Sequence, residues 1–261
     1  MKHDKLLFID LSYYVIHRYF AVLRWFKFQG IEQADQTQDA TFTRFDKSFE
    51  ADVKNLCKRH EVELDQVIFV KDTPRDTIWR MSLFREYKGG RASLSNFDPE
   101  IFVHVEGRLL SRVGCRMIEC ARAEADDIIA VARRTLDVDM VIITNDHDYI
   151  QLLPNGVNTD HTTIVNANNE PLTKKYTEEM LQVFLEYKVC KGDTSDNIPS
   201  IGKKIGEKTA LKLACDPVAL AARKTADPAV AAQYELNKTL MSFDCIPADI
   251  VNAIVAVLDG L

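Results

Sequence analysis

The chain has 261 residues, of which 46% are hydrophobic and 28% charged, a composition typical of a globular protein that buries a sizeable core. It carries 33 Lys and Arg against 39 Asp and Glu, a net charge of −6, whereas nucleic-acid-binding proteins usually carry a basic excess. No apolar run approaches the roughly 20 residues of a membrane-spanning helix, and we expect no signal peptide. The six cysteines form no Cys-x-x-Cys pair, so we expect reduced thiols and an intracellular protein.

Short apolar runs and amphipathic segments alternate along the first two thirds of the chain. The apolar runs predict buried strands at 6–10, 67–70, 116–119 and 141–144. Helical patterns cover 12–27 and a second segment that ends near residue 60. This alternation predicts an α/β fold with a mainly parallel central sheet flanked by helices. Segments 156–158 and 162–166 could add an edge hairpin.

After about residue 173 the pattern changes to helices with short connections. We expect these helices at 178–188, 208–214, 229–243 and 248–258. The sequence therefore predicts an α/β body over 1–172 and a helical region over 173–261.

Acidic residues follow three of the predicted strands. Asp10 closes the first, Asp72 follows the second, and Asp146 and Asp148 follow the run at 141–144. A single acid at such a place is usually an ordinary helix cap. Because parallel strands bind ligands beyond their carboxyl ends, acids at three strand ends together indicate a site.

Two further acidic groups accompany the strand ends. Glu124, Asp126 and Asp127 open an amphipathic helix, where they also suit the helix dipole, and Asp193 and Asp196 lie in a loop. The proposed acidic set has nine members: Asp10, Asp72, Glu124, Asp126, Asp127, Asp146, Asp148, Asp193 and Asp196. Nine carboxylates can share one cleft only if cations offset them, and oxygen ligands favour Mg²⁺ or Mn²⁺. Two such ions about 4 Å apart would activate water and stabilise the leaving oxygen of a phosphodiester.

Other common reaction chemistries lack their residues in this chain. The first strand is followed by Leu-Ser-Tyr-Tyr and not by Gly-x-Gly-x-x-Gly, which excludes a Rossmann dinucleotide site. Ser12 stands where a phosphatase of the haloacid dehalogenase type needs a second aspartate. Neither a phosphate-binding Gly-x-x-x-x-Gly-Lys-Ser/Thr loop nor a Gly-x-Ser-x-Gly nucleophile elbow is present.

Two segments could contact phosphates. The first has glycines and lysines before a helix, which suits sequence-independent grip on a duplex backbone: Gly202, Lys203, Lys204, Gly206, Lys208 and Thr209. The second interleaves basic residues with an aromatic, which suits a single strand or a terminal phosphate: Arg75, Arg80, Arg85, Tyr87, Lys88 and Arg91. The alternative for the first segment is a helix-turn-helix corner with solvated lysines. The alternative for the second is an ordinary charged helix face.

Seven short motifs occur in an order that resembles the flap endonuclease and 5′-nuclease family. They are Phe8-Ile-Asp10, Phe69-Val-Lys-Asp72, Glu86-Tyr-Lys-Gly89 with Arg91, Glu124-Ala-Asp-Asp127, Asn145-Asp-His-Asp148, Gly192-Asp-Thr-Ser-Asp-Asn-Ile-Pro199 and Ile205-Gly-Glu-Lys-Thr-Ala210. The segment at 242–250 is similar to the phage ribonuclease H branch of that family. The resemblance implies a PIN-like nuclease body with a helical arch at about 80–105. It also implies a helix-three-turn-helix motif at about 190–214 that grips duplex DNA, where K⁺ can bind.

The resemblance further implies a Mg²⁺-dependent enzyme with two ions, which Mn²⁺ can replace, that cuts 5′ flaps and 5′ ends. Its substrates would be branched or 5′-ended double-stranded DNA and RNA/DNA hybrids in replication and repair. Residues implied for the first ion are Asp10, Asp72, Glu124 and Asp126, with Asp127 close by. Those implied for the second are Asp146, Asp148 and Asp193, with Asp196 acting through water. Lys88 and Arg91 would steer the scissile phosphate, and Tyr87 would stack on a base.

Two features depart from the family pattern. The segment from Pro199 to Gly206 is one residue longer than the common bacterial form, and Ser200 replaces a usual glycine. We expect a monomer. We also expect no sliding-clamp partner, because no Gln-x-x-hydrophobic-x-x-aromatic-aromatic tail is present. A PIN-type ribonuclease and a catalytically inactive DNA-binding module are the alternatives. When the nine proposed ligands are left out, the chain has 30 acidic and 33 basic residues, so the remaining surface is compatible with binding DNA.

Overall fold

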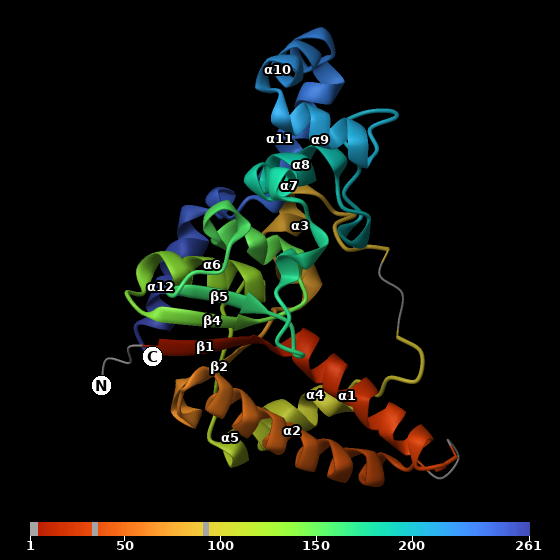
Figure 1. Cartoon of the computed structure of the whole chain (residues 1–261), viewed down its shortest axis with the longest axis vertical. Coiled ribbons are helices and arrows are strands. Elements are labelled where there is room, and N and C mark those ends of the chain that lie inside the picture. The colour runs from red at the N-terminus through yellow and green to blue at the C-terminus, as the bar shows by residue number, and fades with distance from the viewer. Residues whose placement is uncertain (1–4, 33–35, 91–93) are drawn as a thin grey trace.

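The computed structural model describes residues 5–32, 36–90 and 94–261, and its centre is a five-stranded parallel sheet (Figure 1). The strands are β1 (Lys5–Asp10), β2 (Val67–Val70), β3 (Arg116–Ile118), β4 (Asp139–Ile143) and β5 (Thr162–Val165). Their order is β3-β2-β1-β4-β5. Strands β2 and β3 are therefore added on one side of β1, and β4 and β5 on the other, which makes a topological switch point between β1 and β4. Such a switch point opens a crevice at the carboxyl ends of the strands.

The four predicted strands and the parallel sheet are confirmed, but the suggested edge hairpin is wrong. Residues 162–165 pair in parallel with β4, with Ile142 opposite Ile164. The antiparallel contacts in this segment are isolated bridges, between Thr159 and Thr162 and between Val165 and Pro171. The turn at 159–162 therefore only redirects the chain into a parallel edge strand.

Helices cover both faces of the sheet (Figure 1). Their bounds are α1 (Leu11–Phe28), α2 (Gln38–His60), α3 (Arg80–Leu83), α4 (Glu100–His104), α5 (Leu110–Val113), α6 (Ala125–Thr135), α7 (Glu178–Gln182), α8 (Phe184–Lys191), α9 (Glu207–Cys215), α10 (Pro217–Ala226), α11 (Pro228–Met241) and α12 (Ala248–Leu258). Leu7 and Ile9 of β1 face the core formed with α1, α2, α4 and α5. Leu6 and Phe8 face the opposite core, formed with α6 and α12. This alternation explains why the strands read as unbroken apolar runs.

The C-terminal third is helical, as predicted, but it does not divide from the body at residue 173. Helices α8 to α11 share a separate apolar core, whereas Phe243, Ile250 and Ile254 return to the core of the sheet. The segment predicted as one helix at 178–188 breaks at Val183, and the helix at 217–226 was not predicted. Leu220 is the buried residue of α10.

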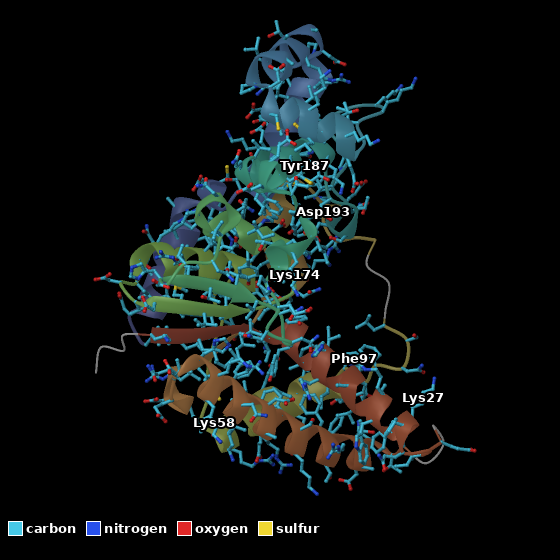
Figure 2. All side chains as sticks on the ribbon, in the orientation of Figure 1. Lys27, Lys58, Phe97, Lys174, Tyr187 and Asp193 are labelled. Carbon is cyan, nitrogen blue, oxygen red and sulfur yellow. The ribbon has the colours of Figure 1, made fainter. Side chains whose placement is uncertain are left out.

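The helical arch predicted over 80–105 is not seen in the described residues of that segment. Helix α3 ends at Leu83, turns cover 85–90, and the described residues 94–99 contain no helix before α4 begins. Phe97 packs edge-on against Tyr19 of α1, with ring centroids 5.0 Å apart (Figure 2). Gly89, Gly90 and Pro99 disfavour a continuous helix here. Across the described ranges, no helix is both long and apolar enough to cross a membrane.

Candidate active site

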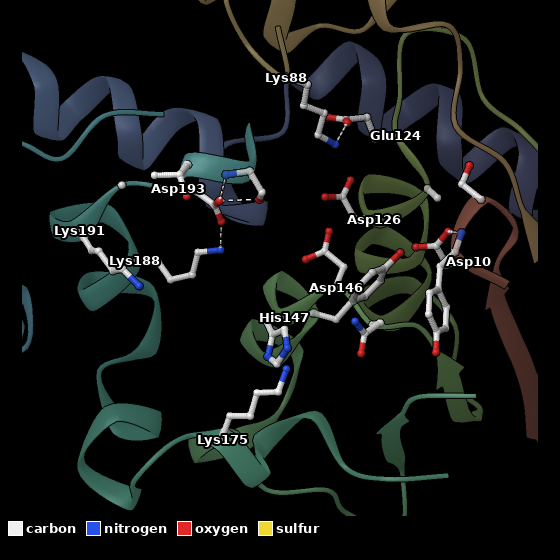
Figure 3. Close-up of a pocket in the computed structure, with 18 of the residues that line it drawn as sticks. Asp10, Lys88, Glu124, Asp126, Asp146, His147, Lys175, Lys188, Lys191 and Asp193 are labelled. Carbon is white, nitrogen blue, oxygen red and sulfur yellow. Dashed lines mark hydrogen bonds and ion pairs between the residues drawn. The ribbon is translucent and has the colours of Figure 1, made fainter. Parts of the chain in front are cut away.

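A cavity of about 800 Å³ opens at the carboxyl ends of the central strands. Six of the nine proposed acidic residues line it: Asp10, Asp72, Glu124, Asp126, Asp146 and Asp193. They come from the end of β1, the turn after β2, the start of α6, the turn after β4 and the loop after α8 (Figure 3). The switch point of the sheet therefore gathers acids that are far apart in the sequence.

Ordinary capping bonds fix several of these carboxylates. Asp10 accepts a hydrogen bond from the Tyr13 amide at 3.0 Å and another from the Thr144 hydroxyl at 3.2 Å. Asp72 accepts from the Ser12 hydroxyl at 3.0 Å and from the amide of Ala125 at 2.8 Å. Asp10 and Asp72 thus accept the hydrogen bonds expected of capping residues. A carboxylate offers about four lone pairs, so each of these two side chains can still bind a cation.

The carboxylates near the end of β1 carry uncompensated negative charge. Burial, followed by the charge of Asp72, raises the pKa of Asp10 from 3.8 to about 7. Burial and the charge of Asp148 raise the pKa of Asp146 to about 6. Burial also raises the pKa of Asp126 well above its ordinary value, although Arg80 acts in the opposite direction. Divalent cations would remove this electrostatic cost, and an all-oxygen donor set suits hard ions.

Arg80, which the sequence assigned to DNA contact, is instead a buried counter-ion with 1% of its surface exposed. It donates to Glu124 at 2.7 Å, to both oxygens of Asp127 at 2.9 and 2.8 Å, and to the Leu240 carbonyl at 2.7 Å. The DNA-contact prediction is wrong because α3 turns inward and its arginine neutralises two buried acids.

Asp127 belongs to this buried network and does not line the cavity. Glu124, Asp126 and Asp127 have oxygens within 4.8 Å of one another, a spacing that could hold a metal ion. However, Asp127 also accepts from the Trp79 indole at 2.9 Å, so its oxygens already serve three protein donors. The cavity-facing part of the cluster is therefore Glu124 with Asp126.

Tyr87 and Asp196 form a second buried pair, and neither residue lines the cavity. Tyr87 has 2% of its surface exposed, and its hydroxyl donates to Asp196 at 3.2 Å. Asp196 is buried and does not line the cavity. The base-stacking prediction for Tyr87 is wrong in this structure, because the ring packs into the core of the helical region.

Lys88 lies at the cavity wall, next to Glu124 (Figure 3). The two side chains form an ion pair, and the ammonium group also stands 5.1 Å from the centre of the Tyr87 ring. Burial alone would raise the pKa of Glu124, but Lys88 and Arg80 outweigh burial and lower it. Arg85 is exposed, and Arg91 lies outside the described residues.

Sequence reasoning missed the lysines on the opposite wall: Lys175, Lys188 and Lys191. Lys188 contacts Asp148 at 2.5 Å and Asp193 at 2.6 Å, with 12% of its side chain exposed (Figure 3). Burial would lower the pKa of Lys188, but the two neighbouring carboxylates outweigh burial and raise it. Lys188 in turn lowers the pKa of Asp193 to about 2, although burial alone would raise that pKa. Asp148 does not line the cavity and is ion-paired with Lys188, which does. The sequence signal that could have predicted this ion pair is spacing, since Lys188 stands five residues before Asp193 across a helix end.

A family model described as 5′-3′ exonuclease, N-terminal resolvase-like domain, matches residues 5–183. The chain belongs to the 5′-3′ exonuclease family. It is 32% identical over 228 residues to DNA polymerase I of Streptococcus pneumoniae, covering 82% of this chain and 24% of the polymerase. It is 26% identical over 222 residues to a 5′-3′ exonuclease of Buchnera aphidicola, covering 81% of this chain and 70% of that protein. The chain thus spans about a quarter of the length of the polymerase relative.

Solved structures share the fold of this 5′-3′ exonuclease family member. The T5 5′-exonuclease with bound zinc matches over 98% of both chains, with a TM-score of 0.62 and 16% identity. The bacteriophage T5 D15 flap endonuclease, in a pseudo-enzyme-product complex with DNA and metal ions, matches over 98% of both chains with a TM-score of 0.60 and 16% identity. The predicted family and PIN-like fold class are therefore confirmed.

The loop between α8 and α9 and the first turn of α9 present the lysines predicted to contact duplex DNA. Lys203, Lys204 and Lys208 are exposed, as are Gly206 and Thr209. A Cβ atom at Gly206 would meet no atom within 4 Å, so an external backbone could approach it.

Two other glycines of this loop serve internal packing. Gly202 faces the core, where a Cβ atom would lie 3.2 Å from Val230 of α11. Gly192 has a φ of 77°, and a Cβ atom there would lie 2.5 Å from the Ile198 and Pro199 backbone. The glycine at 192 is therefore required for the turn that carries Asp193 into the cavity.

Proposed function

We propose that this member of the 5′-3′ exonuclease family is a structure-specific 5′ nuclease that hydrolyses phosphodiester bonds at 5′ flaps and 5′ ends of DNA. The observation that carries the proposal is the convergence of six carboxylates, from five separate chain segments, on one cavity with lysines on its opposite wall. Acids can hold divalent cations, and lysines can hold the anionic backbone of a nucleic acid.

The residues fit Mg²⁺ because the facing ligands are carboxylate oxygens, and the raised pKa values of Asp10 and Asp146 mark unbalanced negative charge. Asp10, Asp72, Glu124 and Asp126 would hold one ion, and Asp146, Asp148 and Asp193 a second. When bound, the ions would supply activated water and stabilise the leaving oxygen. Mn²⁺ has the same ligand preference, so it would substitute.

The chain's own residues would bind and orient the substrate. Lys88 pairs with Glu124 at the cavity wall and would exchange that carboxylate for the scissile phosphate. Lys203, Lys204 and Lys208 would hold the duplex at a distance from the cavity, without reading its sequence. We further propose that RNA/DNA hybrids are also substrates and that K⁺ binds in the loop between α8 and α9. The protein would act as an intracellular monomer.

The deciding experiment incubates the protein with a labelled 5′-flap duplex in Mg²⁺ or in EDTA. Cleavage near the junction that requires Mg²⁺ is expected for the wild type. Asp146→Ala should bind the flap and fail to cut it, because Asp146 faces the cavity and contacts no duplex-binding lysine. Binding without Mg²⁺-dependent cleavage by the wild type would favour an inactive DNA-binding module. Cleavage of single-stranded RNA in place of the flap would favour a PIN-type ribonuclease.

A further inference from the structure

Tyr149 is a core residue with a buried hydroxyl, and it also lines the acidic cavity. The residue lies in the 3₁₀ turn His147–Leu152, directly after Asp148, and its surface is 0% exposed. The ring is part of the core on the α6 face, with its centroid 6.3 Å from that of Phe243. The side chain nevertheless contributes to the cavity lining.

The hydroxyl of Tyr149 has no hydrogen-bond partner among the residues that the structure describes. The charges that act on it are those of Asp10, Asp126, Asp146 and Asp72, all of which line the same cavity. A buried hydroxyl without a partner destabilises the folded state, whereas phenylalanine would fill the same space without that cost. Tyrosine at this position therefore suits a hydrogen-bond partner that enters through the cavity.

Water bound to a metal ion fits this position better than a protein group. Mg²⁺ gives up its waters reluctantly and usually keeps several of them in a protein site. A divalent ion polarises these waters and makes them stronger hydrogen-bond donors. The hydroxyl of Tyr149 is neutral near pH 7 and has two acceptor lone pairs, whereas the adjacent carboxylates would be occupied by the ion itself.

We propose that Tyr149 is a positioning residue whose hydroxyl oxygen accepts a hydrogen bond from a hydration water of the first proposed ion, the one assigned to Asp10, Asp72, Glu124 and Asp126. The inference rests on the proposed metal-dependent function and adds a residue to it. The hydroxyl would fix the orientation of that water and so strengthen binding of the hydrated ion. It makes no bond to the DNA.

The test replaces Tyr149 with phenylalanine and measures Mg²⁺ binding by calorimetry in the absence of DNA. We expect Tyr149→Phe to weaken Mg²⁺ binding about 3-fold to 10-fold, the effect of one lost hydrogen bond. Its melting temperature in EDTA should equal or exceed that of the wild type, because only an unpaired hydroxyl is lost. Tyr14→Phe is the matched control, since Tyr14 is equally buried but lies in the core on the opposite face of the sheet.

Unchanged Mg²⁺ affinity in Tyr149→Phe overturns the proposal, whatever happens to cleavage. Weaker Mg²⁺ binding together with a lower melting temperature in EDTA also overturns it, because the residue would then act through packing. Flap cleavage is measured in parallel, and kcat should fall while KM for the flap stays unchanged. If the wild type binds Mg²⁺ but cuts no flap, the proposed function fails while the calorimetric comparison still decides the role of Tyr149.

Discussion

Replacing Asp10 with asparagine should stabilise the metal-free protein, and more at pH 8 than at pH 5. Burial and the neighbouring Asp72 raise the pKa of Asp10 from 3.8 to about 7. Between these two values the folded state holds a proton that the unfolded state has lost, so stability falls as the pH rises through this window. Above pH 7 the carboxylate is ionised in both states, and the full cost is present.

The size of the effect follows from the pKa shift. One pKa unit corresponds to about 1.4 kcal/mol, so ionised Asp10 costs the folded protein on the order of 4 kcal/mol at pH 8. At pH 5 only the interval between pH 3.8 and 5 contributes, which is about 1.6 kcal/mol. Asparagine keeps an acceptor for the Tyr13 amide and removes the charge. The gain from Asp10→Asn should therefore be about 2.5 kcal/mol larger at pH 8 than at pH 5.

Urea unfolding of the wild type and Asp10→Asn in EDTA, at both pH values, measures this difference. Asp160→Asn is the control, because Asp160 is exposed and its replacement should change stability by less than about 0.5 kcal/mol. Adding Mg²⁺ at pH 8 should stabilise the wild type and have little effect on Asp10→Asn. Equal or lower stability of Asp10→Asn at pH 8 would refute the view that this carboxylate is electrostatically unbalanced.

Three further substitutions test the basic residues around the cavity. Lys88→Ala should slow single-turnover flap cleavage roughly 10²-fold with flap binding retained, as expected for a lost electrostatic contact to the reacting phosphate; unchanged turnover would contradict that role. Arg80→Gln should lower the free energy of unfolding by about 3–5 kcal/mol, because it leaves buried carboxylates uncompensated, whereas exposed Arg85→Gln should have little effect in the same urea titration. Lys188→Met should lower stability strongly in EDTA and much less in Mg²⁺, since an ion can replace the lost ammonium; an equal loss in both buffers would argue against competition between lysine and metal.

The sequence predicted four of the five strands and six of the acids that line the cavity, because both depend on local signals. Continuous apolar runs identify doubly covered parallel strands, and parallel pairing then brings the strand ends together. Asp10 and Asp146 are separated by more than 130 residues, yet they meet because β1 pairs directly with β4.

The basic residues were predicted less well because their roles depend on tertiary contacts. Arg80 and Tyr87 occur in a segment rich in positive charge, which suggested a surface for DNA. Arg80 is buried by its contacts with α6 and α11, and Tyr87 by the core of the helical region and Asp196, all of which lie more than 35 residues further along the chain. Tyr149 likewise carries no local sign of a role, and for Lys188 the only local sign is its spacing from Asp193, because each acquires its position from neighbours on other elements.

The charges of the cavity divide into a balanced half and an unbalanced half. Arg80 and Lys88 neutralise Glu124, and Lys188 lies between Asp148 and Asp193. Near the end of β1, by contrast, burial and the charges of Asp72 and Asp146 raise the pKa of Asp10, and Asp10 and Asp72 receive hydrogen bonds from neutral donors. A cation gains most where negative charge is least compensated, so the first divalent ion should bind near Asp10. A second ion at Asp193 must compete with an ammonium group already in place, and its binding should therefore be weaker.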